Sequence, residues 1–234
     1  MNTNKELNFL NQKIVYDITR FTTTDYVGQI SCIIWFIGCN FRCLYCYNDS
    51  IVYTKMGKYD FKEVLKFLKS RIGLLDSVVL SGGEATIHNL IPICKEIKKL
   101  GFKIKLDTNG SNFKQIKELV EVKLIDYMAI DFKAPKYKFK EITETSIYDN
   151  IVKTIQYLVK IDFDFELRTT VNSKLLDEND INLIIKEIVL LGYKKTYYIQ
   201  NFLETSSNIG NIEKGRDLDK SLINSGNLVI QYRN

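Results

Sequence analysis

The apolar residues of the chain fall in short runs that alternate with amphipathic stretches. The first run, Ile30 to Ile37, is almost continuously apolar, which is typical of a buried strand. The stretch from Asp60 to Ile72 has an aspartate at the N-cap position of a helix. Its apolar residues recur at helical spacing, at Phe61, Val64, Leu65, Leu68 and Ile72. The pattern therefore predicts a strand over 30–37 and a helix over 60–72.

The same alternation continues to residue 202. The further strands are predicted at 77–83, 103–110, 126–132, 165–171 and 196–202, and the further helices at 89–100, 112–122, 148–161 and 178–192. Six strands that recur roughly thirty residues apart predict an α/β fold with a parallel sheet covered by helices. Six units fall short of a closed eightfold barrel, so we expect a partial (β/α)6 TIM-type barrel, with a doubly wound sheet as the alternative.

The domain organisation follows from the same pattern. We expect a single domain over residues 1–234, with a core at about 28–202. Residues 203–234 are more polar and form a C-terminal extension, in which 227–233 has the composition of a last edge strand.

Polar residues and glycines gather where the predicted strands end. These positions are Cys39, Gly82, Gly83, Glu84, Asp107, Thr108, Asn109, Asp131, Lys133, Arg168, Gln200 and Asn201. Both candidate architectures bind their ligands at the carboxyl ends of the strands. We therefore expect these side chains to line one cavity.

The composition of the chain argues against several classes of function. Apolar residues make up 45% of the chain and charged residues 26%, which are values of a globular protein. The net charge is +5, but no arginine-rich run or zinc-finger spacing accompanies it, so we expect no nucleic-acid binding. The longest apolar run, at 32–39, is too short for a bilayer, and the N-terminus shows no apolar export segment. We therefore expect a cytoplasmic protein without a membrane partner.

The segment GCNFRCLYCYN, at 38–48, carries Cys39, Cys43 and Cys46 and suggests three chemistries. A structural zinc site needs a fourth ligand, which would have to be Cys32, Cys94 or His88. A redox pair of Cys43 and Cys46 needs no third cysteine. A four-iron cluster held by three thiolates leaves one iron open to a substrate or cofactor. The spacing favours the cluster and leaves the other two open.

This C-x3-C-x2-C segment, with Tyr45 before its last cysteine, resembles the signature of the radical S-adenosylmethionine (SAM) enzymes. The resemblance implies a catalytic [4Fe-4S] cluster on Cys39, Cys43 and Cys46, with Tyr45 beside the cofactor. In that family the fourth iron binds SAM, which is cleaved reductively to methionine and an adenosyl radical. SGGEAT, at 81–86, is similar to the GGE motif of the family, and the similarity implies that Gly82, Gly83 and Glu84 meet the methionine part of SAM.

Two further motifs, LDTNG at 106–110 and DFKAP at 131–135, are similar to those of glycyl-radical-enzyme activases, as is DYVG at 25–28. The similarity implies that Asp107 and Thr108 lie near the methionine and, with Asp131, hold a monovalent cation. It also implies that Lys133 pairs with the SAM carboxylate and that Arg168 does similar work. On the last strand, where the pyruvate formate-lyase branch has a histidine, this chain departs and offers Gln200 and Asn201, which can form hydrogen bonds but do not titrate. Phe41, Tyr45, Tyr47 and Trp35 would shield the cluster.

The chain most resembles the activating proteins of anaerobic ribonucleoside-triphosphate reductase. It lacks the cysteines of an inserted ferredoxin-like domain, and we expect Cys32 and Cys94 to be small buried residues. The resemblance implies that flavodoxin or ferredoxin delivers an electron and that a glycine of the reductase loses a hydrogen atom. Tyr47, Ala85 and Val27 depart from the activase motifs, and His88 is expected at a helix start rather than in catalysis. The alternatives are a radical SAM enzyme acting on a small molecule, like 7-carboxy-7-deazaguanine synthase, and a zinc-binding interaction domain.

Overall fold

The computed structural model describes residues 9–233, and these form two compact units. The first unit runs to Asn40 and continues over Ser50–Thr108 and Lys114–Met128. The second comprises Phe41–Asp49, Asn109–Phe113 and the chain from Ala129 onward. The single domain expected from the sequence stays a prediction, and the two units are described in turn. Part of the N-terminal segment in which we expect no export signal lies outside the described residues.

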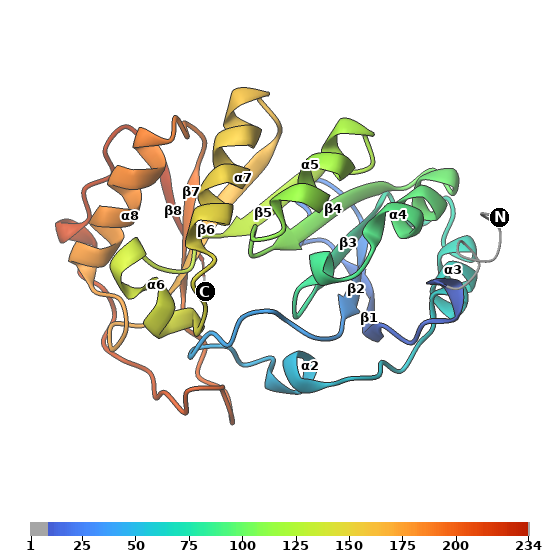
Figure 1. The fold of residues 1–234 in the computed structure, drawn as a ribbon, viewed down its shortest axis with the longest axis horizontal. Coiled ribbons are helices and arrows are strands. Elements are labelled where there is room, and N and C mark those ends of the chain that lie inside the picture. Colours follow the sequence, from blue (N-terminus) through green and yellow to red (C-terminus); the bar gives the residue numbers. More distant parts are fainter. Residues whose placement is uncertain (1–8, 234) are drawn as a thin grey trace. The chain divides into compact units, whose positions relative to one another are not determined.

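The first unit contains four strands that follow one another in chain order in the sheet (Figure 1). They are β1 Val15–Thr22, β2 Ser31–Phe36, β3 Ser77–Gly82 and β4 Lys103–Thr108. Strands β2, β3 and β4 are parallel, as predicted, whereas β1 pairs antiparallel with β2. The sequence analysis did not predict β1. Only Val15 of its eight residues is fully buried, because its side chains face solvent along much of its length, so it lacks a continuous apolar run.

The α-helices of the first unit lie where they were predicted but are shorter than the predicted ranges. They are α3 Phe61–Lys69, α4 Leu90–Lys99 and α5 Phe113–Glu121, together with the 3-10 turns η1 Phe9–Asn11 and η2 Ala85–Ile87. Asp60 caps α3 as predicted, and Glu63 completes a capping box. The predicted end of this helix was wrong. The helix stops at Lys69, and Ile72 lies beyond it with 55% of its surface exposed.

The second unit holds the later strands, again in chain order. They are β5 Tyr127–Asp131, which starts in the first unit, β6 Phe165–Val171, β7 Tyr197–Asn201 and β8 Ile230–Arg233. Strand β6 pairs in parallel with β7, and β7 with β8. The last edge strand predicted within 227–233 is thereby confirmed as β8. The amide of Phe132 donates to the carbonyl of Arg168 and ties the end of β5 to β6 (2.8 Å).

The helices of the second unit are α6 Lys136–Thr143, α7 Tyr148–Lys160 and α8 Glu178–Leu190. A short helix, α2 Asp49–Tyr53, follows the cysteine segment and belongs, apart from Asp49, to the first unit. Helices α7 and α8 were predicted from the sequence, whereas α6 and α2 were not. Strand β7 has no α-helix after it among the described residues. Residues 202–229 instead form an extended connection to β8 with one 3-10 turn, η3 Lys220–Leu222. No helix among the described residues is long and apolar enough to cross a membrane.

Candidate functional site

The second unit holds the cysteine loop, residues 41–49, against helix α6. The amides of Arg42 and Leu44 donate to the carbonyls of Thr143 and Ile142 at the end of the helix, each at 2.9 Å. The ring of Phe41 is buried and meets the ring of Phe139 of α6 edge-on at 5.7 Å. The last turn of α6 therefore supplies carbonyls that would otherwise lack a partner, and these fix the backbone of the loop.

Within this loop the backbone turns tightly between two predicted ligands. The amide of Cys46 donates to the carbonyl of Cys43 (2.9 Å). Burial raises the pKa of the Cys46 thiol, and the nearby Lys133 ammonium acts in the opposite direction, favouring the thiolate. Tyr45, between the two cysteines, is buried, and its hydroxyl has no hydrogen-bond partner among the described residues. A buried polar atom without a partner is unfavourable unless a bound group satisfies it.

Asp131 and Lys133 stand at the end of β5 beside this loop. The Lys133 ammonium lies 2.9 Å from an Asp131 carboxylate oxygen and 5.7 Å from the centre of the Tyr45 ring. Burial alone would lower the pKa of Lys133, but the Asp131 carboxylate outweighs it and raises that pKa well above its usual value. Burial alone would raise the pKa of Asp131, but Arg168 and Lys133 hold it well below its usual value. Both side chains therefore stay charged at neutral pH.

Arg168 is part of a longer chain of charges on one face of the second unit's strands. Its guanidinium bonds the other Asp131 oxygen and lies 3.9 Å from Glu166. Glu166 in turn accepts two hydrogen bonds, each of 3.0 Å, from Arg233 of β8. Glu166 and Arg233 were not predicted from the sequence. Glu166 lies two residues before Arg168 and hence on the same face of β6, a signal that the sequence does contain.

Gln200 is the predicted site residue of β7. In the parallel registers of β6, β7 and β8 it pairs with Thr170 on one side and with Arg233 on the other. Its predicted contact with the cofactor stays a prediction, as do those of Tyr45, Lys133 and Arg168.

In the first unit, the glycines of the GGE motif pack against the backbone that leads to Cys39. A Cβ atom on Gly82, whose φ is +126°, would lie 2.3 Å from the carbonyl oxygen of Phe36. A Cβ atom on Gly83 would lie 2.0 Å from the carbonyl oxygen of Gly38 and 3.3 Å from the Cβ of Cys39. Only glycine fits this close approach. The packing therefore requires glycine at both positions, in addition to the predicted approach to SAM. These close contacts position the backbone at Cys39.

Glu84 joins the ends of two strands. Its side chain is 2% exposed, and one carboxylate oxygen accepts hydrogen bonds from the Thr86 amide (3.1 Å), the Thr86 hydroxyl (2.6 Å) and the Thr108 hydroxyl (2.7 Å). Its backbone amide also donates to the carbonyl of Gly38 (2.8 Å). The carboxylate is therefore an internal acceptor that holds the end of β4 to the turn after β3.

Asp107 has a lysine neighbour that the sequence analysis missed. The Lys105 ammonium lies 3.3 Å from the Asp107 carboxylate, bonds the carbonyl of Asp25 and faces the ring of Tyr127. Asp107 and Asp131, the carboxylates expected to hold a monovalent cation, are thus each paired with cationic groups of the chain itself. The monovalent cation on these residues stays a prediction.

The remaining predicted residues have clear positions in the first unit. Cys32 and Cys94 are fully buried, and burial raises the pKa of each thiol to about 12, which confirms them as small core residues. The His88 Nε2 atom lies 2.8 Å from the carbonyl of Ile37, just before the N-cap Asn89 of α4, as expected of a helix-start residue. The Trp35 indole donates to Thr19 of β1 (2.9 Å).

The expected shielding of the cluster by aromatic residues stays a prediction. Phe41 and Tyr45 are buried, whereas Tyr47 is 47% exposed. No group of three His, Cys, Asp or Glu side chains in residues 9–233 is arranged to hold a metal ion. Ligation by Cys39, Cys43 and Cys46 is thus also a prediction, supported by the chemistry of the three thiols.

Comparison with known proteins identifies the family. The profile described as the Radical SAM superfamily matches residues 33–188. In Methanocaldococcus jannaschii, the protein named "Putative glycyl-radical enzyme activating enzyme MJ1227" is 35% identical over 182 residues, which are 75% of this chain and 75% of that protein. A second protein of that organism with the same description, MJ1632, is 32% identical over 192 residues, 79% of this chain and 71% of its own length.

Two further similarities are to proteins that are not named as activating enzymes. The 7-carboxy-7-deazaguanine synthase of Buchnera aphidicola is 23% identical over 210 residues, 76% of this chain and 91% of its own length. The crystal structure of Streptococcus suis SuiB bound to S-adenosylmethionine has a TM-score of 0.63 at 15% identity. That match covers 77% of this chain and 42% of SuiB, so the chain spans less than half of SuiB's length, and the similarity shows the predicted α/β fold with its parallel, open sheet. The chain belongs to the radical SAM superfamily.

Proposed function

We propose that the chain is a glycyl-radical-enzyme activase whose partner is an anaerobic ribonucleotide reductase. The observation that carries the proposal is the 35% identity, over three quarters of both chains, to a protein named as an activating enzyme of this class. Flavodoxin or ferredoxin would supply the electron. The reductase would supply a backbone glycine, from which a hydrogen atom is removed.

The residues present fit the cofactors that the superfamily implies. Three thiols, of Cys39, Cys43 and Cys46, are soft ligands suited to an iron–sulfur cluster and leave one iron open. The buried Tyr45 hydroxyl lacks a hydrogen-bond partner among the described residues and lies in the loop that carries two of these thiols. When bound, the cluster and SAM supply the radical that abstracts hydrogen.

The chain's own residues do the positioning. Lys133 keeps its proton because Asp131 raises its pKa, so it can donate a charge-assisted hydrogen bond to the SAM carboxylate. The hydroxyl proton of Thr108 is committed to Glu84, so toward a ligand this hydroxyl can only accept. The buried aromatic side chains of Phe41 and Tyr45 exclude water from the loop. Hydrogen-atom abstraction needs no general base, in agreement with a single histidine that is bonded to a backbone carbonyl.

The test is a spin-resonance experiment on protein purified and reconstituted with iron and sulfide without oxygen. The protein is incubated with SAM, a reductant and the anaerobic ribonucleotide reductase encoded in the same genome. We expect an organic glycyl radical signal on the reductase, and none when Cys43→Ser replaces the wild type. SAM cleavage without a protein radical would contradict the activase proposal.

A second candidate function rests on the coverage of the deazaguanine synthase, of whose length 91% is matched. When the small-molecule substrate of the deazaguanine synthase replaces the reductase in this experiment, formation of a deazapurine product would favour it. A colourless protein that carries zinc and neither iron nor sulfide would instead favour the non-enzymatic interaction domain.

A further inference from the structure

The extended connection after β7 contacts the cysteine loop directly, within the second unit. We call residues 207–219 the strap. The amide of Ile209 donates to the carbonyl of Cys46 (3.0 Å), and the amide of Gly210 donates to the carbonyl of Leu44 (2.7 Å). The loop thus uses its amides toward α6 and its carbonyls toward the strap, and both sides of its backbone are bonded.

The strap has the local chemistry that this contact needs. A Cβ atom on Gly210 would lie 2.9 Å from both the Cβ and the carbonyl oxygen of Leu44, so a side chain there would push the strap off the loop. The φ angle of Gly210 is not in the left-handed region, so the requirement is steric. The buried Asn208 side chain bonds the amide (2.7 Å) and the carbonyl (2.8 Å) of Ile212, which closes a compact turn around Gly210.

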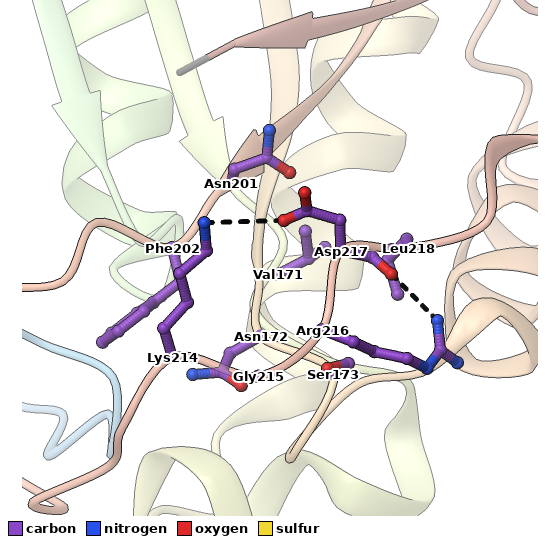
Figure 2. Close-up of a pocket in the computed structure, with 10 residues that line it drawn as sticks. All are labelled: Val171, Asn172, Ser173, Asn201, Phe202, Lys214, Gly215, Arg216, Asp217 and Leu218. Carbon is purple, nitrogen blue, oxygen red and sulfur yellow. Dashed lines mark hydrogen bonds and ion pairs between the residues drawn. The ribbon is translucent and has the colours of Figure 1, made fainter.

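The far end of the strap is fixed at the start of α8. Arg216 donates to both Glu178 oxygens, at 2.6 and 2.7 Å, and the Asp219 amide donates to one of them (2.7 Å). Asn172, after β6, donates to the carbonyl of Glu213 (3.0 Å). Residues 214–218 of the strap line a small hollow beside the ends of β6 and β7 (Figure 2).

Gly215, which lines the hollow, offers a comparison with Gly210. A Cβ atom there would lie 2.2 Å from the Ser173 hydroxyl and 2.8 Å from the Asn172 side-chain oxygen, so this glycine packs on the loop before α8. Both glycines therefore let the strap approach another segment closely. Only Gly210 approaches the cysteine loop.

We propose that the strap is a positioning element for the cluster, with Gly210 and Asn208 as its positioning residues. The proposal rests on the proposed function in that Cys43 and Cys46 must be cluster ligands. The carbonyls that the strap bonds belong to Cys46 and to Leu44, so the segment between the two ligands cannot shift without breaking one of these hydrogen bonds. Groups that orient metal ligands in this way change metal retention and redox properties when they are altered.

The test compares Gly210→Ala with Gly215→Ala, which places the same methyl group on the same strap away from the cysteine loop. Both variants are reconstituted without oxygen, and three properties are measured. These are iron release to a chelator, the low-temperature spin-resonance spectrum of the reduced cluster with and without SAM, and the melting temperature Tm. For Gly210→Ala we expect about tenfold faster iron release and a changed spectrum. For Gly215→Ala we expect the wild-type spectrum and release rate, whatever its loss in Tm.

A second variant, Asn208→Asp, keeps the acceptor for the Ile212 amide and replaces the donor to the Ile212 carbonyl by a carboxylate oxygen that repels it, so it should also release iron faster than the wild type. The proposal is overturned if Gly210→Ala has the wild-type spectrum and release rate, or if Gly215→Ala changes both as much. A wild-type protein that forms the cluster but activates no reductase would refute the proposed function alone. A wild-type protein that forms no cluster would refute both.

Discussion

Replacing Thr108 by valine separates a structural role of this residue from the predicted cofactor role. The Thr108 side chain is 3% exposed and donates a 2.7 Å hydrogen bond to the Glu84 carboxylate. Valine has the same shape but removes the donor to a charged acceptor, a loss of about 2 kcal/mol. For a chain of this length, about 2 kcal/mol corresponds to a fall in Tm of about 4 to 8 °C. We therefore expect that fall for cluster-free Thr108→Val, followed by circular dichroism at pH 7.

The matched control is Thr108→Ser, which keeps the donor, and a double-mutant cycle isolates the hydrogen bond. In a Glu84→Gln background the acceptor is neutral, so Thr108→Val should cost only about 1 kcal/mol. A Tm for Thr108→Val within about 1 °C of wild type would refute the structural role, because that change equals less than about 0.5 kcal/mol. If Thr108→Val instead raised the KM for SAM and left the Tm unchanged, the hydroxyl would bind the cofactor rather than stabilise the fold.

Three further outcomes follow from the charged residues. Arg216 holds the pKa of Glu178 at about 2, below its usual 4.5, so this pair stabilises the fold above pH 4.5 and the stabilisation is lost as the pH falls through 2. The Tm difference between wild type and Arg216→Ala should therefore shrink from pH 6 to pH 2, and a constant difference would contradict the ion pair. Lys133→Met should weaken SAM binding to the reconstituted protein about tenfold in calorimetry, because one charge-assisted hydrogen bond is lost. An unchanged affinity would show that Lys133 does not contact SAM. The cation that the resemblance implies for Asp107, Thr108 and Asp131 predicts faster SAM cleavage in potassium salts than in tetramethylammonium salts, and an equal rate in the two would contradict that role.

The strands could be predicted where apolar residues form a continuous run, as in β2, or alternate with polar ones, as at the start of β6. Strand β6 has the predicted bounds, 165–171. Strand β1 and helix α6 were missed for a common reason. Asp17 and Arg20 interrupt the apolar pattern of β1, and four charged residues occupy the eight positions of α6, so tertiary contacts rather than an amphipathic pattern decide both elements.

The site could be predicted where its residues end strands, since the turn after a strand can be located from the sequence. The residues that pair with them were harder to predict. Lys105 precedes Asp107 by two positions, and Glu166 precedes Arg168 by two, so period-2 alternation places each beside a predicted residue on the same strand face. Arg233 meets Glu166 from 67 positions away, and no local pattern predicts such a contact.

The three cysteines owe their positions to different long-range backbone contacts. Cys39 follows a strand end whose carbonyls, at Phe36 and Gly38, bond the amides of Gly83 and Glu84. Cys43 and Cys46 lie in a loop bonded on one side by α6 and on the other by the strap. The spacing C-x3-C-x2-C therefore fixes only how far apart the thiols can be, while these remote contacts hold the backbone at Cys39 in the first unit and at Cys43 and Cys46 in the second. A substitution at Gly83 should act through Cys39 and one at Gly210 through Cys43 and Cys46, so the two should change the spectrum of the reduced cluster in different ways.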